Sequence, residues 1–182
     1  MAAMTVAQTY PQLLSLADWR ALGEDEDTRT ELQEGVLFVL PGPAKSHARV
    51  ISRLVTQISA QLPDGVEALA EVDLVVDSST PATVRVPDVV ICAEFAEELL
   101  ESAQVEVVVE VLSPGTRRTD LVTKRSEYAD AGIGHYWIID RDLGVLTALE
   151  LTDDGYVGTD HTGVFSTEKP YPLSVDMDAL SL

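Results

Sequence analysis

The chain has 182 residues, of which 46% are hydrophobic and 24% are charged. This length and apolar content predict one globular domain with a sizeable core and exclude a disordered chain. Twelve Lys and Arg against 31 Asp and Glu give a formal net charge of −19, which excludes a protein that coats nucleic acid through bulk charge. The single cysteine excludes an intrachain disulfide and a cysteine-based zinc cluster. Neither a signal peptide nor an apolar run of roughly 18 residues is visible, so we expect a cytoplasmic protein without a membrane partner.

Hydrophobic periodicity predicts the elements of the first half of the chain. A short helix is expected over 11–22, followed by a hairpin over 31–40 that turns at Glu34-Gly35. Apolar residues at three- and four-residue spacing predict a helix over 44–62. Runs rich in Val, Leu and Ile predict strands over 66–77, 84–92 and 105–112. The acidic segment 94–102 predicts a short helix or turn.

The second half begins with a helix predicted over 118–131, which ends at Gly132. Two strands over 135–140 and 144–151 follow as a hairpin, and the Gly- and Pro-punctuated tail predicts at most one more short strand. Strands mixed with a few helices indicate an α/β or α+β fold with a mixed or mostly antiparallel sheet.

Two carboxylates interrupt predicted strands that are otherwise apolar. Asp88 lies in VRVPDVVIC, and Glu110 lies in VEVVVEVL. A carboxylate buried in such a strand costs several kcal/mol unless a partner compensates it. If the two strands are neighbours, the two acids converge, and a shared Mg²⁺ or Mn²⁺ relieves their repulsion. The alternative is that Asp88 caps a turn after Pro87 and that each acid is satisfied separately.

A lysine also has an unexpected position in the predicted 118–131 helix. On a helical wheel Lys124 falls inside the apolar arc, which is defined by Leu121, Val122, Tyr128, Ala129 and Ala131. The opposite, polar side carries Asp120, Thr123, Ser126, Glu127 and Asp130. Arg125 falls within the apolar arc as well, so one of these two cations meets carboxylates and the other extends to the edge of the helix.

The chain resembles a known family in a segment that runs from Pro87 to Asp140. The residues that carry the likeness are Pro87-Asp88, then Val109-Glu110-Val111-Leu112-Ser113-Pro114, then Arg117-Arg118-x-Asp120-x-x-x-Lys124-x-x-x-Tyr128-Ala129-x-Ala131-Gly132-x-x-x-Tyr136-Trp137-x-x-Asp140. This pattern resembles the Uma2 family of restriction endonucleases, also called DUF820, in the PD-(D/E)XK nuclease-like superfamily. The likeness starts near Glu31, in ELQEG, and covers most of the chain.

The resemblance implies one α/β domain over 1–182 with a restriction-endonuclease-like fold, a mixed central sheet flanked by helices. It implies that Asp88 and Glu110 are catalytic metal ligands, as the Asp of the PD motif and the acid of the (D/E)XK motif. Leu112 stands where the usual pattern has lysine. Lys124, on the following helix, matches the lysine that takes over this catalytic role.

Three further positions belong to the implied site. The backbone carbonyl of Val111 would hold Mg²⁺ together with the two acids, and Mn²⁺ could replace Mg²⁺. Glu31 matches an N-terminal acid that contacts the metal directly or through water; the alternative is an ordinary exposed glutamate. His47 matches a histidine of the family's first helix; the alternative is a polar histidine on the helix surface.

Basic residues gather in two stretches that flank the site in the resembled fold. They predict a surface that faces the phosphates of DNA, made by Lys45, Arg49, Arg53, Arg117 and Arg118. The alternative is a solvated helix face. Family analogy and the apolar HYWII strand favour a homodimer.

The expected function is therefore metal-dependent endonuclease hydrolysis of phosphodiester bonds in DNA. In this hypothesis Lys124 positions the attacking water and stabilises the developing charge. Two alternatives stay open: a nucleic-acid or nucleotide-binding module without turnover, and an oligomeric regulatory protein on a nuclease-like fold. Metal titration and a plasmid cleavage assay distinguish the three.

Overall fold

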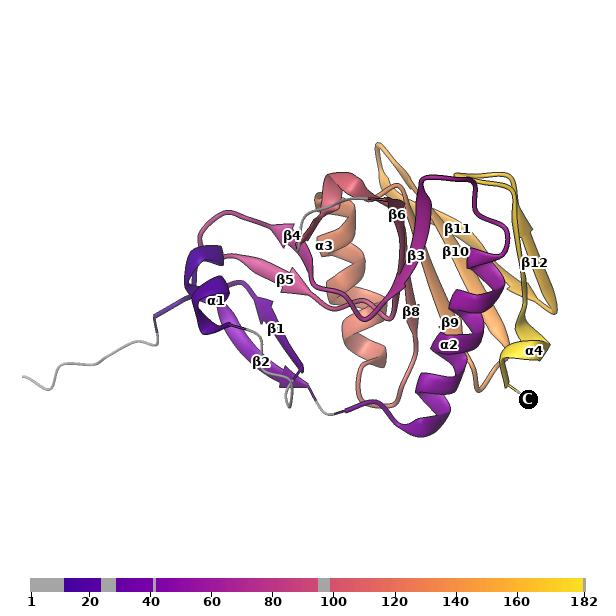
Figure 1. Cartoon of the computed structure of the whole chain (residues 1–182), viewed down its shortest axis with the longest axis horizontal. Helices are drawn as coiled ribbons and strands as arrows, with labels where there is room; N and C mark the ends of the chain where they lie inside the picture. The colour runs from indigo at the N-terminus through magenta and orange to yellow at the C-terminus, as the bar shows by residue number, and fades with distance from the viewer. Residues whose placement is uncertain (1–11, 24–28, 41, 95–98, 182) are drawn as a thin grey trace, which may run out of the picture.

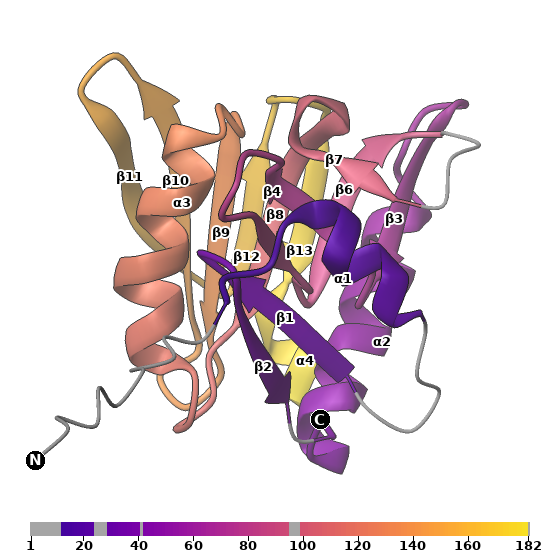
Figure 2. The ribbon, with the colours of Figure 1, turned by 90° about the vertical axis from the view of Figure 1, so that its left-hand side faces the viewer.

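A six-stranded mixed sheet forms the centre of the computed structural model, which describes residues 12–23, 29–40, 42–94 and 99–181. Across the sheet the strands follow one another as β11 (Gly155–Thr162), β10 (Val145–Thr152), β9 (His135–Asp140), β8 (Val105–Val111), β6 (Val89–Ala93) and β3 (Val66–Ala70). β8 and β9 run parallel, and the other neighbours run antiparallel (Figure 2).

Helices cover both faces of this sheet, as the sequence predicts (Figure 1). One face packs against α2 (Lys45–Ser59) and against the hairpin of β12 (Val164–Thr167) and β13 (Leu173–Asp176), followed by α4 (Met177–Ser181). The other face packs against α3 (Lys124–Asp130). β8 is buried on both sides because its alternate residues enter the two cores, which explains why its sequence is an almost continuous valine run.

A second sheet lies beside α3, against the same face of the six-stranded sheet (Figure 2). Its order is β2 (Val36–Leu40), β1 (Arg29–Gln33), β5 (Thr83–Arg85), β4 (Leu74–Asp77) and β7 (Leu100–Glu101). The predicted hairpin turn is confirmed: Glu34 and Gly35 have φ values of 46° and 77°, as a type I′ turn requires. α1 (Leu16–Leu22) covers the outer face of this sheet and buries Trp19 there.

Two of the predicted strands are each divided in the structure. The 66–77 segment forms β3 and β4, and the 84–92 segment forms β5 and β6, which belong to different sheets. The chain crosses between the sheets at residues 86–88, where Pro87 cannot donate to a strand ladder. Asp88 therefore lies at the crossing and not inside a strand.

Three further expectations from the sequence concern the C-terminal tail, the acidic segment 94–102 and the HYWII strand. The tail forms β11, β12, β13 and α4, so the prediction of a single short strand there is wrong. In the predicted acidic segment 94–102, residues 95–98 lie outside the described part of the chain, and the remainder forms β7 and a 3₁₀ turn at Ser102–Gln104. The HYWII strand is interior, since β9 pairs with β8 on one side and β10 on the other, so it offers no surface for a second copy.

Across the described ranges, every helix is too short or too polar to span a lipid bilayer.

Candidate active site

Lys124 stands at the centre of a buried group of carboxylates between the two sheets. Its Nζ atom lies 2.8 Å from Oε1 of Glu110, 3.2 Å from Oε1 of Glu31 and 3.7 Å from Oδ1 of Asp120. All four side chains are almost completely buried. A buried ammonium of this kind is stable only among carboxylates. We call Glu31, Asp88, Glu110 and Asp120 the carboxylate cluster.

Asp88 joins this cluster because β6 and β8 are neighbours. Their register pairs Val89 with Val109, which brings Asp88, one residue before Val89, to the level of Glu110. The Coulomb interaction between these two acids contributes to the high pKa of Glu110. The structure thus brings Asp88, Glu110 and Lys124 together, as the strand and wheel arguments expect.

The carboxylate of Asp88 has two partners of its own. Its Oδ2 accepts a 2.7 Å hydrogen bond from the backbone N–H of Val111, and its Oδ1 lies 3.0 Å from Nε2 of His47. His47 is in the first turn of α2, so this contact ties the helix to the cluster. Both oxygens of Asp88 are therefore engaged by the protein itself.

A π-helical turn decides which residues of the helix face the cluster. The turn, η2 (Thr119–Thr123), precedes α3 and contains more residues per turn than the α-helix that the wheel assumes. Asp120 is consequently buried with 1% of its surface exposed, whereas Leu121 and Val122 are exposed at 37% and 62%. The wheel therefore misplaced all three residues. Its placement of Lys124 holds, because Lys124 begins the regular α-helix after the turn.

The two cations that the wheel could not separate have different environments. Lys124 is buried in the cluster, while Arg125 is exposed and donates from Nη2 to the carbonyl of Tyr156 at 2.7 Å. Arg125 therefore extends to the edge of the helix, and it is the natural control for any substitution of Lys124.

Arg85 is a buried cation that the sequence analysis missed. Its guanidinium donates to Oε2 of Glu31 at 2.9 Å and to both carboxylate oxygens of Glu127 at 2.8 and 2.6 Å. Oε1 of Glu31 also accepts the backbone N–H of Val86 at 3.1 Å. The available signal was the arginine inside the apolar run TVRV, the same kind of interruption that marks Asp88.

The cluster holds more negative than positive charge. Lys124 pairs with three of the four carboxylates, and the other buried cation, Arg85, is shared between Glu31 and Glu127. Burial raises the pKa of Glu110; Lys124 opposes this shift, and Asp88 and Asp120 add to it. Burial likewise raises the pKa of Asp120, whose Oδ1 accepts no hydrogen bond. Burial and the mutual repulsion of the acids thus both favour the neutral forms of Glu110 and Asp120.

We expect the stability of Glu110→Gln relative to the native chain to increase with pH. A carboxyl group whose pKa rises on folding stabilises the fold below its ordinary pKa, and this contribution disappears as pH rises through the folded pKa. Glutamine cannot titrate, but its Oε1 still accepts from Lys124 and Tyr128, as that of Glu110 does. Thermal melts in EDTA from acidic to mildly alkaline pH measure the difference. A difference that stays constant across this range would contradict the raised pKa.

The donor chemistry of the cluster fits a hard divalent cation. Its ligating atoms are carboxylate oxygens, which suit Mg²⁺ and Mn²⁺, and it has an uncompensated negative charge and an acceptor, Asp120 Oδ1, without a hydrogen bond. Within the described ranges, no three His, Cys, Asp or Glu side chains converge closely enough to hold an ion as they stand. In this structure the ammonium of Lys124 is the cation around which the oxygens gather.

The predicted basic surface is only partly free. Lys45, Arg49 and Arg118 are exposed, and Arg117 forms a 2.7 Å ion pair with Asp140. Arg53 is half-buried and donates to carbonyls near the end of α4, which removes it from the phosphate-facing surface.

Arg141 is a cation near the start of α2 that the sequence analysis did not select. It follows β9 and donates from Nη1 to Oγ of Ser46 at 3.1 Å. The contact brings Arg141 to the first turn of α2, beside the exposed Lys45. Only the tertiary contact places these distant positions together.

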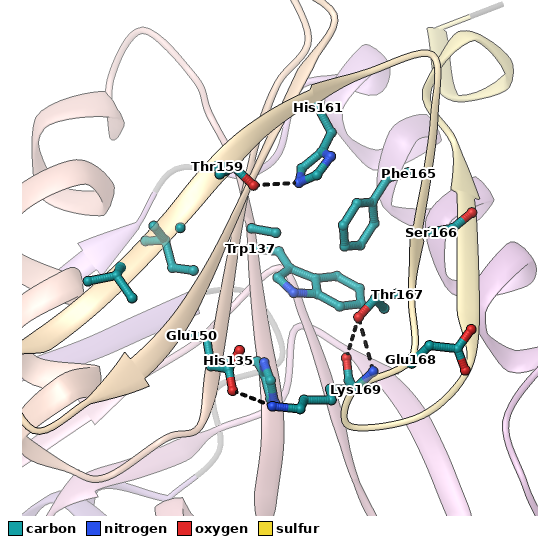
Figure 3. A pocket seen from close by; sticks show the side chains of 14 residues that line it. His135, Trp137, Glu150, Thr159, His161, Phe165, Ser166, Thr167, Glu168 and Lys169 are labelled. Carbon is teal, nitrogen blue, oxygen red and sulfur yellow. Dashed lines mark hydrogen bonds and ion pairs between the residues drawn. The ribbon is translucent and has the colours of Figure 1, made fainter.

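A separate cavity of about 400 Å³ lies on the other side of the six-stranded sheet (Figure 3). Trp137 and Phe165 stand edge to face in it, with ring centroids 5.2 Å apart, and Lys169 pairs with Glu150 at its margin. No residue of the carboxylate cluster lines it. The cavity is thus independent of the candidate active site.

Comparison with known proteins assigns the chain to a protein family. The Uma2 family, described as "Putative restriction endonuclease", matches residues 10–176, and a search of the curated proteins finds no match. The fold is similar to the crystal structure of "a putative nuclease belonging to DUF820" from Anabaena variabilis, with a TM-score of 0.71 and 19% sequence identity, over 92% of this chain and 97% of that chain. Since the family match spans nearly the whole sequence, the protein belongs to the Uma2 family.

Proposed function

We propose that this Uma2 protein is a metal-dependent endonuclease that hydrolyses phosphodiester bonds of DNA, acting as one domain over residues 1–182. The observation that carries the proposal is the excess of buried carboxylates around Lys124. Four buried acids face only the ammonium of Lys124 and the guanidinium of Arg85, which is shared with Glu127. Such an excess is costly for a purely structural purpose, but it suits a site that takes up a divalent cation. Asp88, Glu110 and the carbonyl of Val111 would hold Mg²⁺ or Mn²⁺, with Glu31 in contact directly or through water.

A bound divalent cation would polarise the phosphoryl oxygen and lower the pKa of a water molecule. The protein's own contribution centres on Lys124. Although burial opposes it, the surrounding carboxylates raise the pKa of Lys124, so its ammonium stays charged. A charged Lys124 donates hydrogen bonds to the attacking water and stabilises developing negative charge; it does not accept a proton. Glu110 and Glu31 hold its Nζ in place at 2.8 and 3.2 Å.

His47 has a positioning role in this proposal. Its Nε2 lies 3.0 Å from Oδ1 of Asp88, while its Nδ1 is buried without a hydrogen-bond partner among the described residues. The imidazole orients the carboxylate of Asp88 from the side of α2. A second contact that orients a ligating group is a common support of metal sites.

DNA reaches the site through local cations, since the chain as a whole is strongly acidic. Lys45 and Arg49 are exposed on α2, and Arg118 is exposed before the π-helical turn. Arg141 is held near the same end of α2 by its contact with Ser46. Lys45, Arg49 and Arg141 therefore lie around the beginning of α2, the helix that carries His47.

We expect the double variant Lys45→Ala/Arg49→Ala to bind DNA more weakly and with a smaller dependence on salt. Each lost phosphate contact reduces the slope of log affinity against log salt by about 0.9, so the slope falls by about 1.8. Fluorescence anisotropy with labelled duplex DNA in a salt series measures this slope. The control is Lys169→Ala, which removes a lysine whose side chain is 70% exposed beside the separate cavity. Equal slopes for the native chain and the double variant would exclude this surface.

The direct test is cleavage of supercoiled plasmid with Mg²⁺, Mn²⁺ or EDTA. We expect nicked and linear products only with a divalent cation, and none with Glu110→Gln. This variant retains the acceptor for Lys124 and Tyr128 and removes only the charge. Cleavage in EDTA, or equal cleavage by the variant and the native chain, would refute the proposal.

One observation favours a second candidate, a DNA-binding protein without turnover. Lys124 already neutralises part of the cluster in the way a structural ion pair does. In this alternative the cluster binds no metal, and calorimetric titration with Mn²⁺ shows no heat of binding while duplex DNA still binds. The endonuclease proposal instead expects Mn²⁺ to bind with an affinity that increases with pH, because ligating carboxylates must be deprotonated.

A further inference from the structure

The cavity remote from the carboxylate cluster has a defined place in the fold. Its floor is the end of the six-stranded sheet that β9, β10 and β11 form, and β12 with the turn after it makes the opposite wall (Figure 3). The register of β9 and β10 pairs His135 with Glu150 and Trp137 with Ala148. These residues share one face of the sheet, and all four line the cavity. A volume of about 400 Å³ is in the range of small-molecule sites.

The inner end of the cavity is aromatic. Besides the contact between Trp137 and Phe165, the ring of His161 lies 4.9 Å from that of Phe165 between centroids. Trp137 and Phe165 belong to the hydrophobic core, so the fold holds their rings in place. Such a wall suits a flat apolar ring, because aromatic pairs gain from edge-to-face and offset contacts beyond the area that they bury.

The outer end of the cavity carries a pair of opposite charges (Figure 3). Nζ of Lys169 lies 3.0 Å from Oε1 of Glu150, and the two side chains are 70% and 52% exposed. An ion pair with this exposure contributes little to stability, so it opens easily. A cation and an anion at the rim of an aromatic cavity match a ligand that carries both charges beside one ring.

The distance between the two ends limits the length of the ligand. Glu150 stands opposite His135, and Trp137 follows His135 by two residues on β9. Two residues extend about 7 Å along a strand. An aromatic amino acid matches this length, because its ammonium and carboxylate share one carbon atom and its ring is one methylene away.

We propose that this cavity binds a free amino acid with an aromatic side chain. The ring lies against Trp137 and Phe165, the ammonium pairs with Glu150, and the carboxylate pairs with Lys169. An amine without a carboxylate leaves Lys169 without a partner, and a carboxylic acid without an amine leaves Glu150 without one. The zwitterion therefore replaces the ion pair of the rim with two new ion pairs.

The other charges near the rim favour a zwitterion over an anion. Burial lowers the pKa of His135, so its imidazole is uncharged at neutral pH and adds no cation to Lys169. Glu168 is exposed in the turn after β12 and lines the same rim. A nucleotide or another anion meets these acids and the net charge of −19, whereas a zwitterion carries no net charge.

The test is calorimetric titration of the full chain with L-phenylalanine, phenethylamine, 3-phenylpropionate and L-alanine. We expect saturable binding of L-phenylalanine and none of L-alanine, which lacks the ring. Phenethylamine and 3-phenylpropionate each lack one charge and should bind about fivefold more weakly, the effect of one exposed ion pair. Absence of saturable L-phenylalanine binding, or equal affinity for all three aromatic probes, would overturn the inference.

Two variants at the rim test which charge each side chain binds. Lys169→Met should weaken the binding of L-phenylalanine and leave that of phenethylamine unchanged. Glu150→Gln should weaken the binding of L-phenylalanine and leave that of 3-phenylpropionate unchanged. Both side chains are largely exposed, so neither change disturbs the core. The control is Arg20→Met on α1, an exposed cation outside the cavity, which should bind L-phenylalanine as the native chain does. Native affinity in both rim variants would contradict the proposed pairing.

Tryptophan fluorescence tests the place of binding independently. The chain has two tryptophans: Trp137 lines the cavity, and Trp19 lies in the core of the second sheet. L-Phenylalanine should change the emission of the native chain and of Trp19→Phe to the same extent, because Trp137 is present in both. A change that disappears in Trp19→Phe would move the ligand to the second sheet and refute the assignment.

Discussion

Lys124→Ala should lower DNA cleavage by about 10²–10³-fold, the size of effect seen when a preorganised electrostatic donor is removed. Binding of Mn²⁺ should not weaken, because the substitution removes a cation from the neighbourhood of the metal. The metal-free protein should lose about 3–5 kcal/mol of stability, since three carboxylates lose the ammonium that lies within 3.7 Å of each. Plasmid cleavage, calorimetric titration and thermal melts measure the three effects on one variant.

The combination of these effects distinguishes a catalytic from a structural lysine. If the cluster binds a divalent cation, Mn²⁺ should restore more stability to Lys124→Ala than it adds to the native chain, because the ion replaces the lost ammonium. Arg125→Ala is the control on the same helix, with an exposed side chain bonded to the carbonyl of Tyr156. Loss of cleavage in Arg125→Ala but not in Lys124→Ala would transfer the role to Arg125.

Arg85→Met should destabilise the protein by about 3–5 kcal/mol, because the buried carboxylate of Glu31 and the carboxylate of Glu127 lose their shared guanidinium. The stability lost by Arg85→Met relative to the native chain should become smaller at low pH. Burial raises the pKa of Glu31, but Lys124 and Arg85 together lower it below its ordinary value. A carboxylate with a lowered pKa stabilises the fold above its unfolded pKa, and that contribution is lost as pH falls through the folded pKa. The stabilities of the native chain and the variant therefore become more similar as the pH falls.

The matched control for Arg85 is Arg117→Met. Arg117 also forms a short ion pair, 2.7 Å from Asp140, but half of its side chain is exposed to solvent. Solvent screens such a pair, so the loss should be below about 1 kcal/mol. Urea unfolding at neutral and acidic pH measures both variants. Equal losses for Arg85→Met and Arg117→Met would show that burial does not decide the strength of these pairs.

The sequence predicts the elements of this fold well where the signal is local. The apolar stripe of α2, the valine run of β8 and the Glu34-Gly35 turn each depend on residues within one turn or one strand. The sequence is less informative where one apolar run serves two sheets. β5 and β6 are consecutive in sequence, but β5 pairs with β1 and β4 in one sheet while β6 pairs with β3 and β8 in the other, and local propensity does not contain this separation.

The residues of the candidate site also differ in whether the sequence alone reveals them. Asp88, Glu110 and Lys124 are visible in the sequence because each charge interrupts an apolar pattern. Asp120 is not visible, because the π-helical turn changes the helical phase by hydrogen bonds that no spacing rule anticipates. Arg85 interrupts an apolar run as well, but its partners Glu31 and Glu127 lie 54 and 42 positions away.

The sequence alone therefore predicts the family, the main helices and strands, and the charges that cannot be buried alone. Which opposite charge meets each of them depends on how the distant segments pack. Packing α3 and the second sheet on the same face of the six-stranded sheet brings acids from β1, β8 and the π-helical turn within 3.7 Å of one ammonium. Among the described residues, the same arrangement leaves four apolar side chains of β2 exposed at the edge of the second sheet. Both outcomes depend on contacts between distant segments, because burial and charge compensation act through space and not along the chain.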